Sequence, residues 1–157
     1  MEGDPNASIA SQVLTWRPMA DTQAVAKHVP TALVLAVIHR ESGGNPDAFN
    51  VEAKVNDASF GLMQLLLQTA RKLGFQGVPR LLFEPAVNIE LGTRYLRDLL
   101  RKRGDVYLAL IEYNGGPVAV TLYLKGWRLG PAVHYANVVN RLYLYYQQRL
   151  QMGGGQP

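Results

Sequence analysis

The chain has 157 residues, of which 48% are hydrophobic, and this size and composition fit one globular domain rather than two. It contains no cysteine, which excludes disulfides, thiolate metal sites and a cysteine nucleophile. The formal net charge of +4 and the pI of about 9.5 favour anionic surroundings such as nucleic acid, anionic lipid or a bacterial envelope.

The beginning of the chain, MEGDPNASIASQVLTW, predicts no secretory signal, because it has acids where a signal peptide has bases and lacks a continuous apolar segment. We treat residues 1–20 as an N-terminal extension. The longer apolar runs, such as TALVLAVI, are far too short to cross a bilayer, so we expect no stable membrane insertion.

Helix signals recur along the rest of the chain, with Pro or Asp near the starts and Gly near the ends. The expected helices cover residues 21–28, 31–42, 60–73, 86–103, 106–114, 117–125 and 132–150. Alternating strand patterns of similar quality are missing, so we expect a sheet to be at most a small hairpin within 43–59. The prediction is therefore a mainly α fold with one domain at 21–150 and a disordered tail at 151–157.

The helix expected at 31–42 ends in a carboxylate at a position that disfavours its charge. Val34, Val37 and Ile38 form an aliphatic stripe that leads to Glu41. Burial and the partial negative charge of a helix C-terminus both raise the pKa of this carboxyl group. A carboxylic acid that stays protonated near neutral pH can give a proton to a leaving group. The alternative is a frayed, solvated helix end in which Glu41 pairs with Arg40 or Lys54.

The three histidines, His28, His39 and His134, have no metal-ligand spacing. We expect them to be structural, and we expect neither a metal nor a cofactor.

Four segments resemble, in order, the successive motifs of the soluble lytic transglycosylase family, whose members are related to goose-type lysozyme. They are ESGGNPDA at 41–48, SFGLMQ at 59–64, LFEPAVNIELGTRYL at 82–96 and EYNGGP at 112–117. Any one motif occurs by chance, but four in order are a specific signal. The resemblance implies a lysozyme-like domain that cleaves the peptidoglycan glycan strand between N-acetylmuramic acid and N-acetylglucosamine.

The resemblance also assigns roles around the acid. Glu41 matches the catalytic acid of the family, and Ser42 matches its neighbour in the motif. Tyr113 matches a tyrosine whose hydroxyl points at the catalytic carboxyl group. Ser59 matches a serine near enough to hydrogen-bond the acid.

Four further residues match the glycan-binding groove. Gly61, Met63 and Gln64 match its wall, where a small residue lets sugar approach and an amide binds N-acetyl or hydroxyl groups. Asn114 matches a residue whose amide faces the glycan. Each also has a structural alternative: a helix-start residue for Gly61, core filling for Met63, surface polarity for Gln64 and a left-handed helix cap for Asn114.

The chain departs from the family pattern at two acids. Glu84 stands where the family usually has Asp, and Glu112 stands where it usually has Ala. Adjacent helix residues point in different directions, so we expect Glu112 to face away from the catalytic acid.

The segment between the first two motifs is longer than in many members, which leaves open which of Asn50, Asn56 and Asp57 line the groove. The nearest alternative function is a hydrolytic muramidase of the same fold, in which Asp57 or Glu52 holds a water. A further alternative is an inactive glycan-binding or assembly protein. A nucleic-acid binder is disfavoured, since the positive charge is dispersed and a nucleic-acid motif is missing.

The expected partner is therefore the peptidoglycan glycan strand, with no nucleic acid, and the expected state is a monomer. Without an export signal, we expect synthesis in the host cytoplasm. Delivery to the cell wall would follow either as a phage endolysin or within a phage particle, unless the chain is a fragment of a secreted parent.

Overall fold

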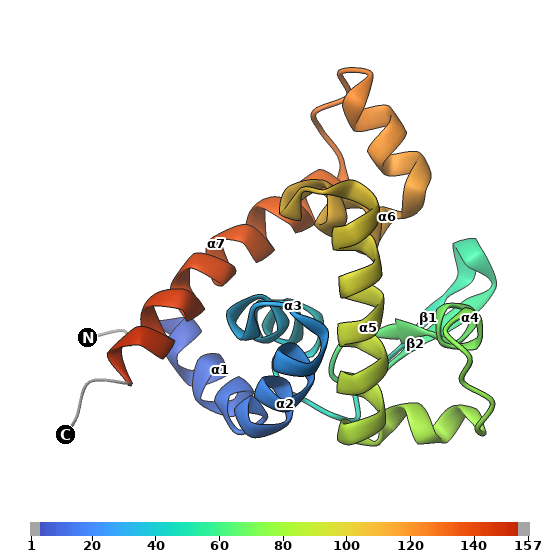
Figure 1. Ribbon diagram of the computed structural model, residues 1–157. Helices are drawn as coiled ribbons and strands as arrows, with labels where there is room; N and C mark the ends of the chain where they lie inside the picture. Colours follow the sequence, from blue (N-terminus) through green and yellow to red (C-terminus); the bar gives the residue numbers. More distant parts are fainter. Residues whose placement is uncertain (1–3, 154–157) are drawn as a thin grey trace.

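The computed structural model describes residues 4–153, in which seven α-helices pack together and a small sheet lies at one side (Figure 1). The helices are α1 (Pro5–Leu14), α2 (Arg17–Lys27), α3 (Thr31–Ser42), α4 (Leu67–Lys72), α5 (Pro85–Arg103), α6 (Val106–Leu124) and α7 (Pro131–Met152). The strands are β1 (Phe49–Glu52), β2 (Asp57–Phe60) and β3 (Leu65–Leu66), and two 3₁₀ turns are η1 (Ala53–Val55) and η2 (Pro79–Phe83). The mainly α fold expected from the sequence is confirmed.

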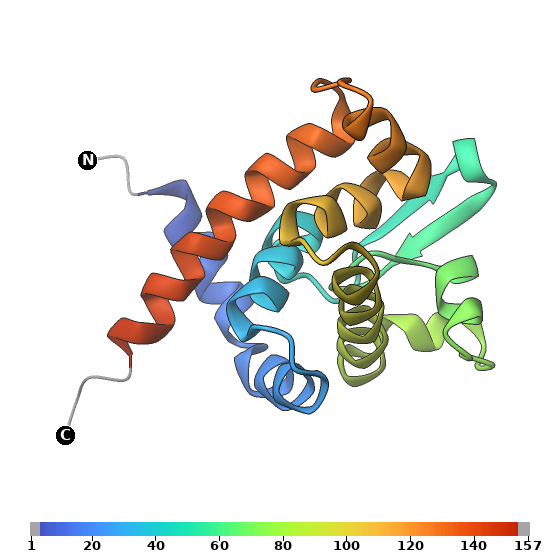
Figure 2. The same cartoon turned by 45° about the horizontal axis from the view of Figure 1, so that its top comes forward.

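The central helix is α3, whose residues 32–39 are all buried. A helix that is apolar on every side must be enclosed by other elements, and α1, α2 and α7 pack against it. Figure 2 shows it between α7 and α5. The helix ends at Gly43, whose φ of 60° is left-handed backbone that glycine adopts without steric cost. Glu41 therefore lies in the last turn of a helix that is fixed by the core.

The sheet begins with the expected hairpin. Strands β1 and β2 are antiparallel, with Phe49 opposite Phe60 and Glu52 opposite Asp57. The turn between them contains Asn56 in left-handed backbone, with a φ of 50°. This hairpin is the element expected within 43–59.

The helix expected at 60–73 is wrong in its first half. After β2 the chain makes a tight turn, adds β3 to the sheet, and begins α4 only at Leu67. Gly61 and Gln64 have φ values of 71° and 49°, which a right-handed helix cannot contain. The apolar pattern of this segment is explained by its burial beneath the sheet, where Phe60 and Leu65 belong to a small second core.

The two helices expected at 106–114 and 117–125 are the halves of α6. They are separated by Gly116, whose φ of 73° and ψ of 179° break the helix. The second half and the loop that follows project from the body before the chain enters α7 (Figure 1). We call residues 117–130 the arm.

The segment expected as an extension contributes α1 and the start of α2. Ala10 and Val13 of α1 are fully buried in the main core, against α3. At the other end, α7 continues to Met152. Residues 1–3 of the expected extension and residues 154–157 of the expected tail lie outside the described residues.

Candidate active site

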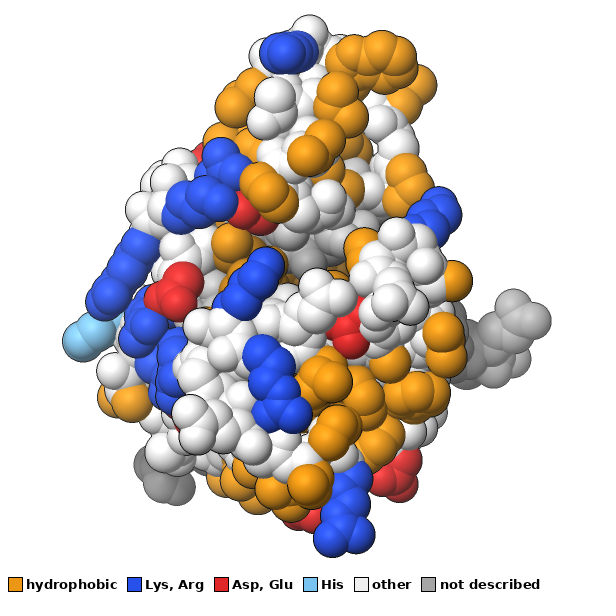
Figure 3. Space-filling model, turned by 90° about the vertical axis from the view of Figure 1, so that its right-hand side faces the viewer, with side chains coloured by type: hydrophobic (Ala, Val, Ile, Leu, Met, Phe, Trp, Pro, Cys, Tyr) orange, Lys and Arg blue, Asp and Glu red, His pale blue; other side chains and the backbone are white. Residues whose placement is uncertain are grey.

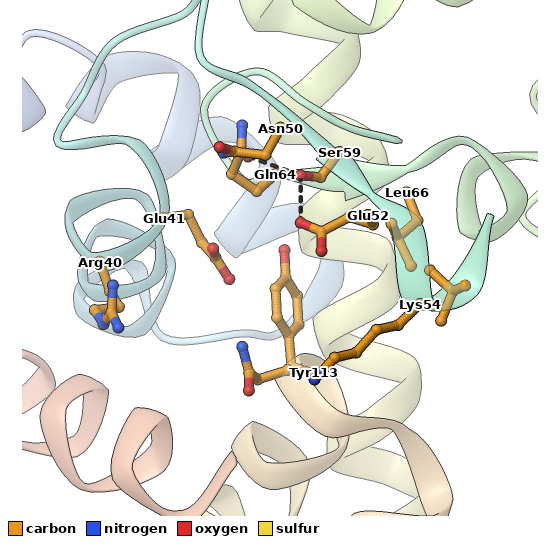
Figure 4. A pocket seen from close by; sticks show the side chains of 11 residues that line it. Arg40, Glu41, Asn50, Glu52, Lys54, Ser59, Gln64, Leu66 and Tyr113 are labelled. Atoms are coloured by element: carbon orange, nitrogen blue, oxygen red, sulfur yellow. Dashed lines mark hydrogen bonds between the residues drawn. The ribbon is translucent and has the colours of Figure 1, made fainter. Parts of the chain in front are cut away.

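A cavity of about 410 Å³ opens between the end of α3, the sheet and the end of the first half of α6. Its lining residues are Arg40, Glu41, Asn50, Glu52, Lys54, Val55, Ser59, Gln64, Leu66, Tyr113 and Asn114. Figure 4 shows Glu41 reaching in from α3 and Glu52 from the sheet, with the Tyr113 hydroxyl between them. The fold thus brings together five of the seven residues predicted for the site.

Glu41 is the acid of this cavity. Its pKa is raised to about 7, mainly by burial and to a smaller extent by the charge of Glu52. Two neighbours lower the pKa and only partly offset this effect: the Tyr135 hydroxyl, which donates a hydrogen bond of 2.8 Å to Oε1, and the charge of Arg40. The carboxyl group therefore keeps its proton up to near neutral pH, as the aliphatic stripe of α3 predicted.

The hydrogen bond to Glu41 comes from Tyr135 on α7, a residue that the sequence analysis missed. Tyr135 is 2% exposed, and its ring stacks on that of Tyr113 with centroids 6.3 Å apart. Burial and the charge of Glu41 raise the pKa of Tyr135 well above its usual range, so that it remains a donor. Its position near the start of an apolar helix face gave a weak signal for burial and none for a partner 94 residues away.

Tyr113 does not make the expected bond to the acid. Its hydroxyl donates to the carbonyl oxygen of Met63 at 2.7 Å, and a phenol has a single proton to donate. The ring lies between Tyr95 and Tyr135, with centroid distances of 5.2 Å and 6.3 Å. Tyr113 therefore forms a wall of the cavity and fixes the turn after β2, while Tyr135 contacts Glu41.

Gln64 lines the cavity, but its amide is fully used within the protein. Nε2 donates to the carbonyl oxygens of Ala48 and Gly61 at 3.0 Å and 2.9 Å. Oε1 accepts from Asn50 Nδ2 at 2.7 Å and from Ser59 Oγ at 2.8 Å. Since an amide group has two donor hydrogens and two acceptor positions, it has no capacity left for an N-acetyl group. Through these bonds Gln64 ties the loop to β1 and β2.

Ser59 also lies in the cavity without touching the acid. Besides its contact with Gln64, its Oγ lies 3.2 Å from Glu52 Oε1. The expected hydrogen bond from Ser59 to Glu41 is not made. A hydroxyl has one proton to donate, and the shorter contact is the one to Gln64, so Ser59 holds Gln64 in place beside Glu52.

Met63 and Gly61 do not form the groove wall. Met63 is 0% exposed and packs against α5, where a Cβ on Gly92 would meet its sulfur at 2.4 Å. Gly61 is buried, and a Cβ there would lie 2.6 Å from Asn88 Nδ2 and 2.7 Å from the Leu82 oxygen. Its small size admits the Asn88 amide rather than a sugar. Met63 thus fills the core, and neither Met63 nor Gly61 is among the residues that line the cavity.

Two further motif residues have different surroundings. Ser42 Oγ donates to the Leu62 carbonyl oxygen at 2.8 Å, which links the end of α3 to the turn after β2. Asn114 is exposed at the cavity rim, where its amide is accessible to a ligand.

Glu112 faces away from the acid, as expected. It is 3% exposed and pairs with Lys102 and Arg103 of α5, each at 2.5 Å. Burial by itself would raise the pKa of Glu112, but the hydrogen bonds from Arg103 and Lys102 lower it overall. This acid therefore anchors α6 on α5.

The loop residues left open by the sequence now separate. Asn50 and Glu52 line the cavity, while Asn56 and Asp57 are not among its lining residues. The Asp57 carboxylate accepts from the backbone N–H of Ala58 and, at the start of α4, of Gln68. Glu52 is therefore the second carboxylate that shares the cavity with Glu41.

Over residues 4–153, His, Cys, Asp and Glu side chains form no group of three that could hold a metal ion. Within the same residues, every helix is too short or too polar to cross a membrane. His39 is buried, and its Nδ1 lies 2.8 Å from the Tyr146 hydroxyl.

Solved structures with this fold come from bacterial lytic transglycosylases. An inactive Glu-to-Gln mutant of lytic transglycosylase Slt from Pseudomonas aeruginosa superposes with a TM-score of 0.75 at 26% identity, covering 88% of this chain and 25% of that one. The 70 kDa soluble lytic transglycosylase from Escherichia coli gives a TM-score of 0.73 at 23% identity, over 87% of this chain and 25% of that one.

Relatives in sequence include a transglycosylase of Enterobacteria phage PRD1, 33% identical over 68% of this chain and 37% of its own length. Membrane-bound lytic murein transglycosylase C of Salmonella arizonae is 33% identical over 76% of this chain and 35% of its own. The chain therefore spans little more than a third of the length of these relatives. The family model described as the transglycosylase SLT domain matches residues 18–127, which is most of the chain. This match covers the α3 acid and the sheet and α6 residues of the cavity, and the chain belongs to the transglycosylase SLT domain family.

Proposed function

We propose that this chain is a peptidoglycan lytic transglycosylase with Glu41 as its only acid and base. The observation that carries the proposal is a carboxyl group with a pKa of about 7, oriented by Tyr135 and open to a cavity. Membership of the family and the names of its lytic murein transglycosylase relatives support the substrate class. The inactive Glu-to-Gln mutant of the Pseudomonas aeruginosa protein supports an essential glutamate.

The proposed reaction has two proton transfers. Glu41 first protonates the glycosidic oxygen that leaves with N-acetylglucosamine, as the bond to the muramic acid anomeric carbon breaks. The primary hydroxyl of the same muramic acid then forms a bond to that carbon and gives its proton back to Glu41. Because the hydroxyl is tethered to the reacting sugar, it has a large effective concentration compared with water. The product is a 1,6-anhydromuramic end, and water is not consumed.

Glu52 gives a specific reason to consider the hydrolytic alternative. It lines the same cavity, and its charge raises the pKa of Glu41, so that the two carboxyl groups are close enough to interact. An inverting hydrolase needs a second carboxylate that activates a water molecule. In that case Glu52 would be the base and the new end would be a reducing sugar.

Mass spectra of peptidoglycan digested in oxygen-labelled water test the proposal. Transglycosylation leaves muramic ends that are one water lighter and carry no label, whereas hydrolysis gives labelled reducing ends. The Glu41→Gln variant should lose about 10²–10⁴-fold in rate, because general acid catalysis contributes about this much. Under the proposal, Glu52→Gln still yields anhydro ends. Labelled reducing ends that disappear in Glu52→Gln would instead establish the muramidase.

The similarity to a phage PRD1 transglycosylase supports a role in attack on the bacterial wall during a phage infection, in lysis or as part of the particle. Release of muropeptides from purified sacculi by the isolated chain, and its loss in Glu41→Gln, would test the wall-degrading activity that both roles require.

A further inference from the structure

The arm presents a group of large apolar side chains to solvent. These are Val118, Leu122, Leu124, Trp127 and Leu129, of which Trp127 is 69% and Leu129 is 89% exposed. Figure 3 shows hydrophobic side chains gathered over this projecting end of the molecule, with a basic group at its tip. Contiguous exposed apolar patches, especially those bordered by polar residues, mark protein or membrane interaction sites.

The charge of the arm has one sign. After Glu112 the sequence contains no acid, and its bases up to Pro157 are Lys125, Arg128, Arg141 and Arg149. Residues 1–112 contain equal numbers of acids and bases, so residues 113–157 account for the whole formal net charge of +4. Two of these bases lie in the arm, and Lys125 and Arg128 flank Trp127 in the sequence KGWRL.

We propose that the arm docks on an anionic lipid surface. Trp127 and Leu129 enter the headgroup region, where the amphipathic tryptophan ring and buried apolar area favour binding. Lys125 and Arg128 contact the lipid phosphates, which attract basic residues beside an interfacial segment. This is peripheral attachment by a loop and does not require a spanning helix.

The position of the arm gives such docking a consequence for the active site. A second cavity shares Gln64, Tyr113 and Asn114 with the cavity around Glu41, and it extends to Gly116 and Pro117 at the base of the arm. Attachment through the arm would therefore hold the cavity against the part of the wall that lies next to a membrane.

Two other occupants fit the arm less well. A second copy of the chain would bring the same bases close together, which opposes association. A glycan strand is bound by both donors and acceptors beside an aromatic ring. Around Trp127 the loop has only Lys125, Gly126, Arg128 and Leu129, whose side chains offer donors but no acceptor. Lipid satisfies both the apolar and the cationic side chains.

Cosedimentation with vesicles tests the proposal on the whole chain. Vesicles of phosphatidylcholine are compared with vesicles containing about one third phosphatidylglycerol, which carry negative charge. We expect binding to the anionic vesicles at about 0.1 M salt and much weaker binding at about 1 M, where the Debye length falls from about 10 Å to about 3 Å. Tryptophan fluorescence should shift to the blue on binding, because Trp127 enters an apolar environment. The other tryptophan, Trp16, should not contribute, because it is part-buried and already donates a hydrogen bond to the Gly44 carbonyl oxygen.

The apolar contribution is tested by replacing both Trp127 and Leu129 with serine. This variant should bind anionic vesicles at least about tenfold more weakly, because each replacement removes an apolar side chain that the lipid would bury. The matched control is Val25→Ser, at a residue that is 74% exposed on α2, at the opposite end of the molecule from the arm (Figure 1). The control should bind as the wild type does.

The cationic contribution is tested by changing Lys125 and Arg128 to glutamine. At about 1 kcal/mol for each base near the surface, binding should weaken about 30-fold. Arg141→Gln, which removes an exposed base of α7 outside the arm, is the control and should have little effect.

Three results would overturn the proposal. The first is no binding to anionic vesicles, or binding that the arm variants leave unchanged. The second is a blue shift of Trp127 caused by purified glycan strands without lipid, which would make the arm part of the glycan site. The third is a concentration-dependent dimer that the serine variant abolishes, which would make the arm an interface between two copies.

Discussion

Replacing Glu41 with glutamine should stabilise the protein above neutral pH and leave its stability almost unchanged in acid. In the folded state the pKa of Glu41 is about 7, against an ordinary value of 4.5. Between these values the unfolded chain releases the proton while the folded protein keeps it. Folding therefore becomes less favourable as pH rises from about 4.5 to about 7, and the loss is complete above the folded pKa.

The size of the effect follows from the difference between the two pKa values. At about 1.4 kcal/mol for each pKa unit, the wild type loses up to about 3 kcal/mol of stability over this range. Glutamine has no proton to release, and its carbonyl oxygen can still accept the Tyr135 hydrogen bond. For a chain of this size, about 3 kcal/mol corresponds to a thermal midpoint about 6–12 °C higher for the variant at pH 8.

Urea unfolding at pH about 4 and about 8 measures this difference. The two proteins should have nearly equal free energies of unfolding at the lower pH, and the variant should be more stable at the higher one. Glu52→Gln serves as a companion, because removing the Glu52 charge lowers the pKa of Glu41 and should reduce the pH dependence. An identical difference between wild type and Glu41→Gln at both pH values would refute the reasoning, since Glu41 would then ionise as an ordinary glutamate.

Two further predictions concern the acid and the turn after β2. Tyr135→Phe should move the alkaline limb of the kcat/KM–pH profile to higher pH, because the Tyr135 hydrogen bond lowers the pKa of Glu41. The control Tyr113→Phe loses a bond to a backbone carbonyl oxygen instead and should leave the limb in place. An unchanged limb in both variants would contradict this assignment. In urea unfolding, Gly61→Ala should lower the free energy of unfolding by about 1–3 kcal/mol more than Gly104→Ala does. Both positions have positive φ, but only a Cβ at Gly61 would overlap neighbouring atoms. Equal losses in the two variants would show that the turn relaxes.

The sequence by itself determined most helices, the break in α6 and the position of the acid. These features depend on local chemistry. A continuous apolar run makes α3 a helix that is buried on every side, and Gly43 and Gly116 end or break helices because glycine adopts positive φ without steric cost. The direction of the Glu41 pKa shift was also predictable, because its apolar helix must be enclosed and burial is the largest cause of the shift. Four short motifs were enough to place the chain in its family, because their order and spacing are encoded directly.

Only the tertiary structure decided which side chains the acid and its neighbours contact. Tyr135, rather than Tyr113, bonds to Glu41, because α7 packs along α3 and brings a residue 94 positions away to the carboxyl group. Gln64 and Met63 belong to motifs that suggested a sugar-binding wall, but one has a saturated amide and the other is buried against Gly92. Residue type and local spacing do not tell which partner a hydrogen-bonding group will have, because that partner is set by how distant segments pack together.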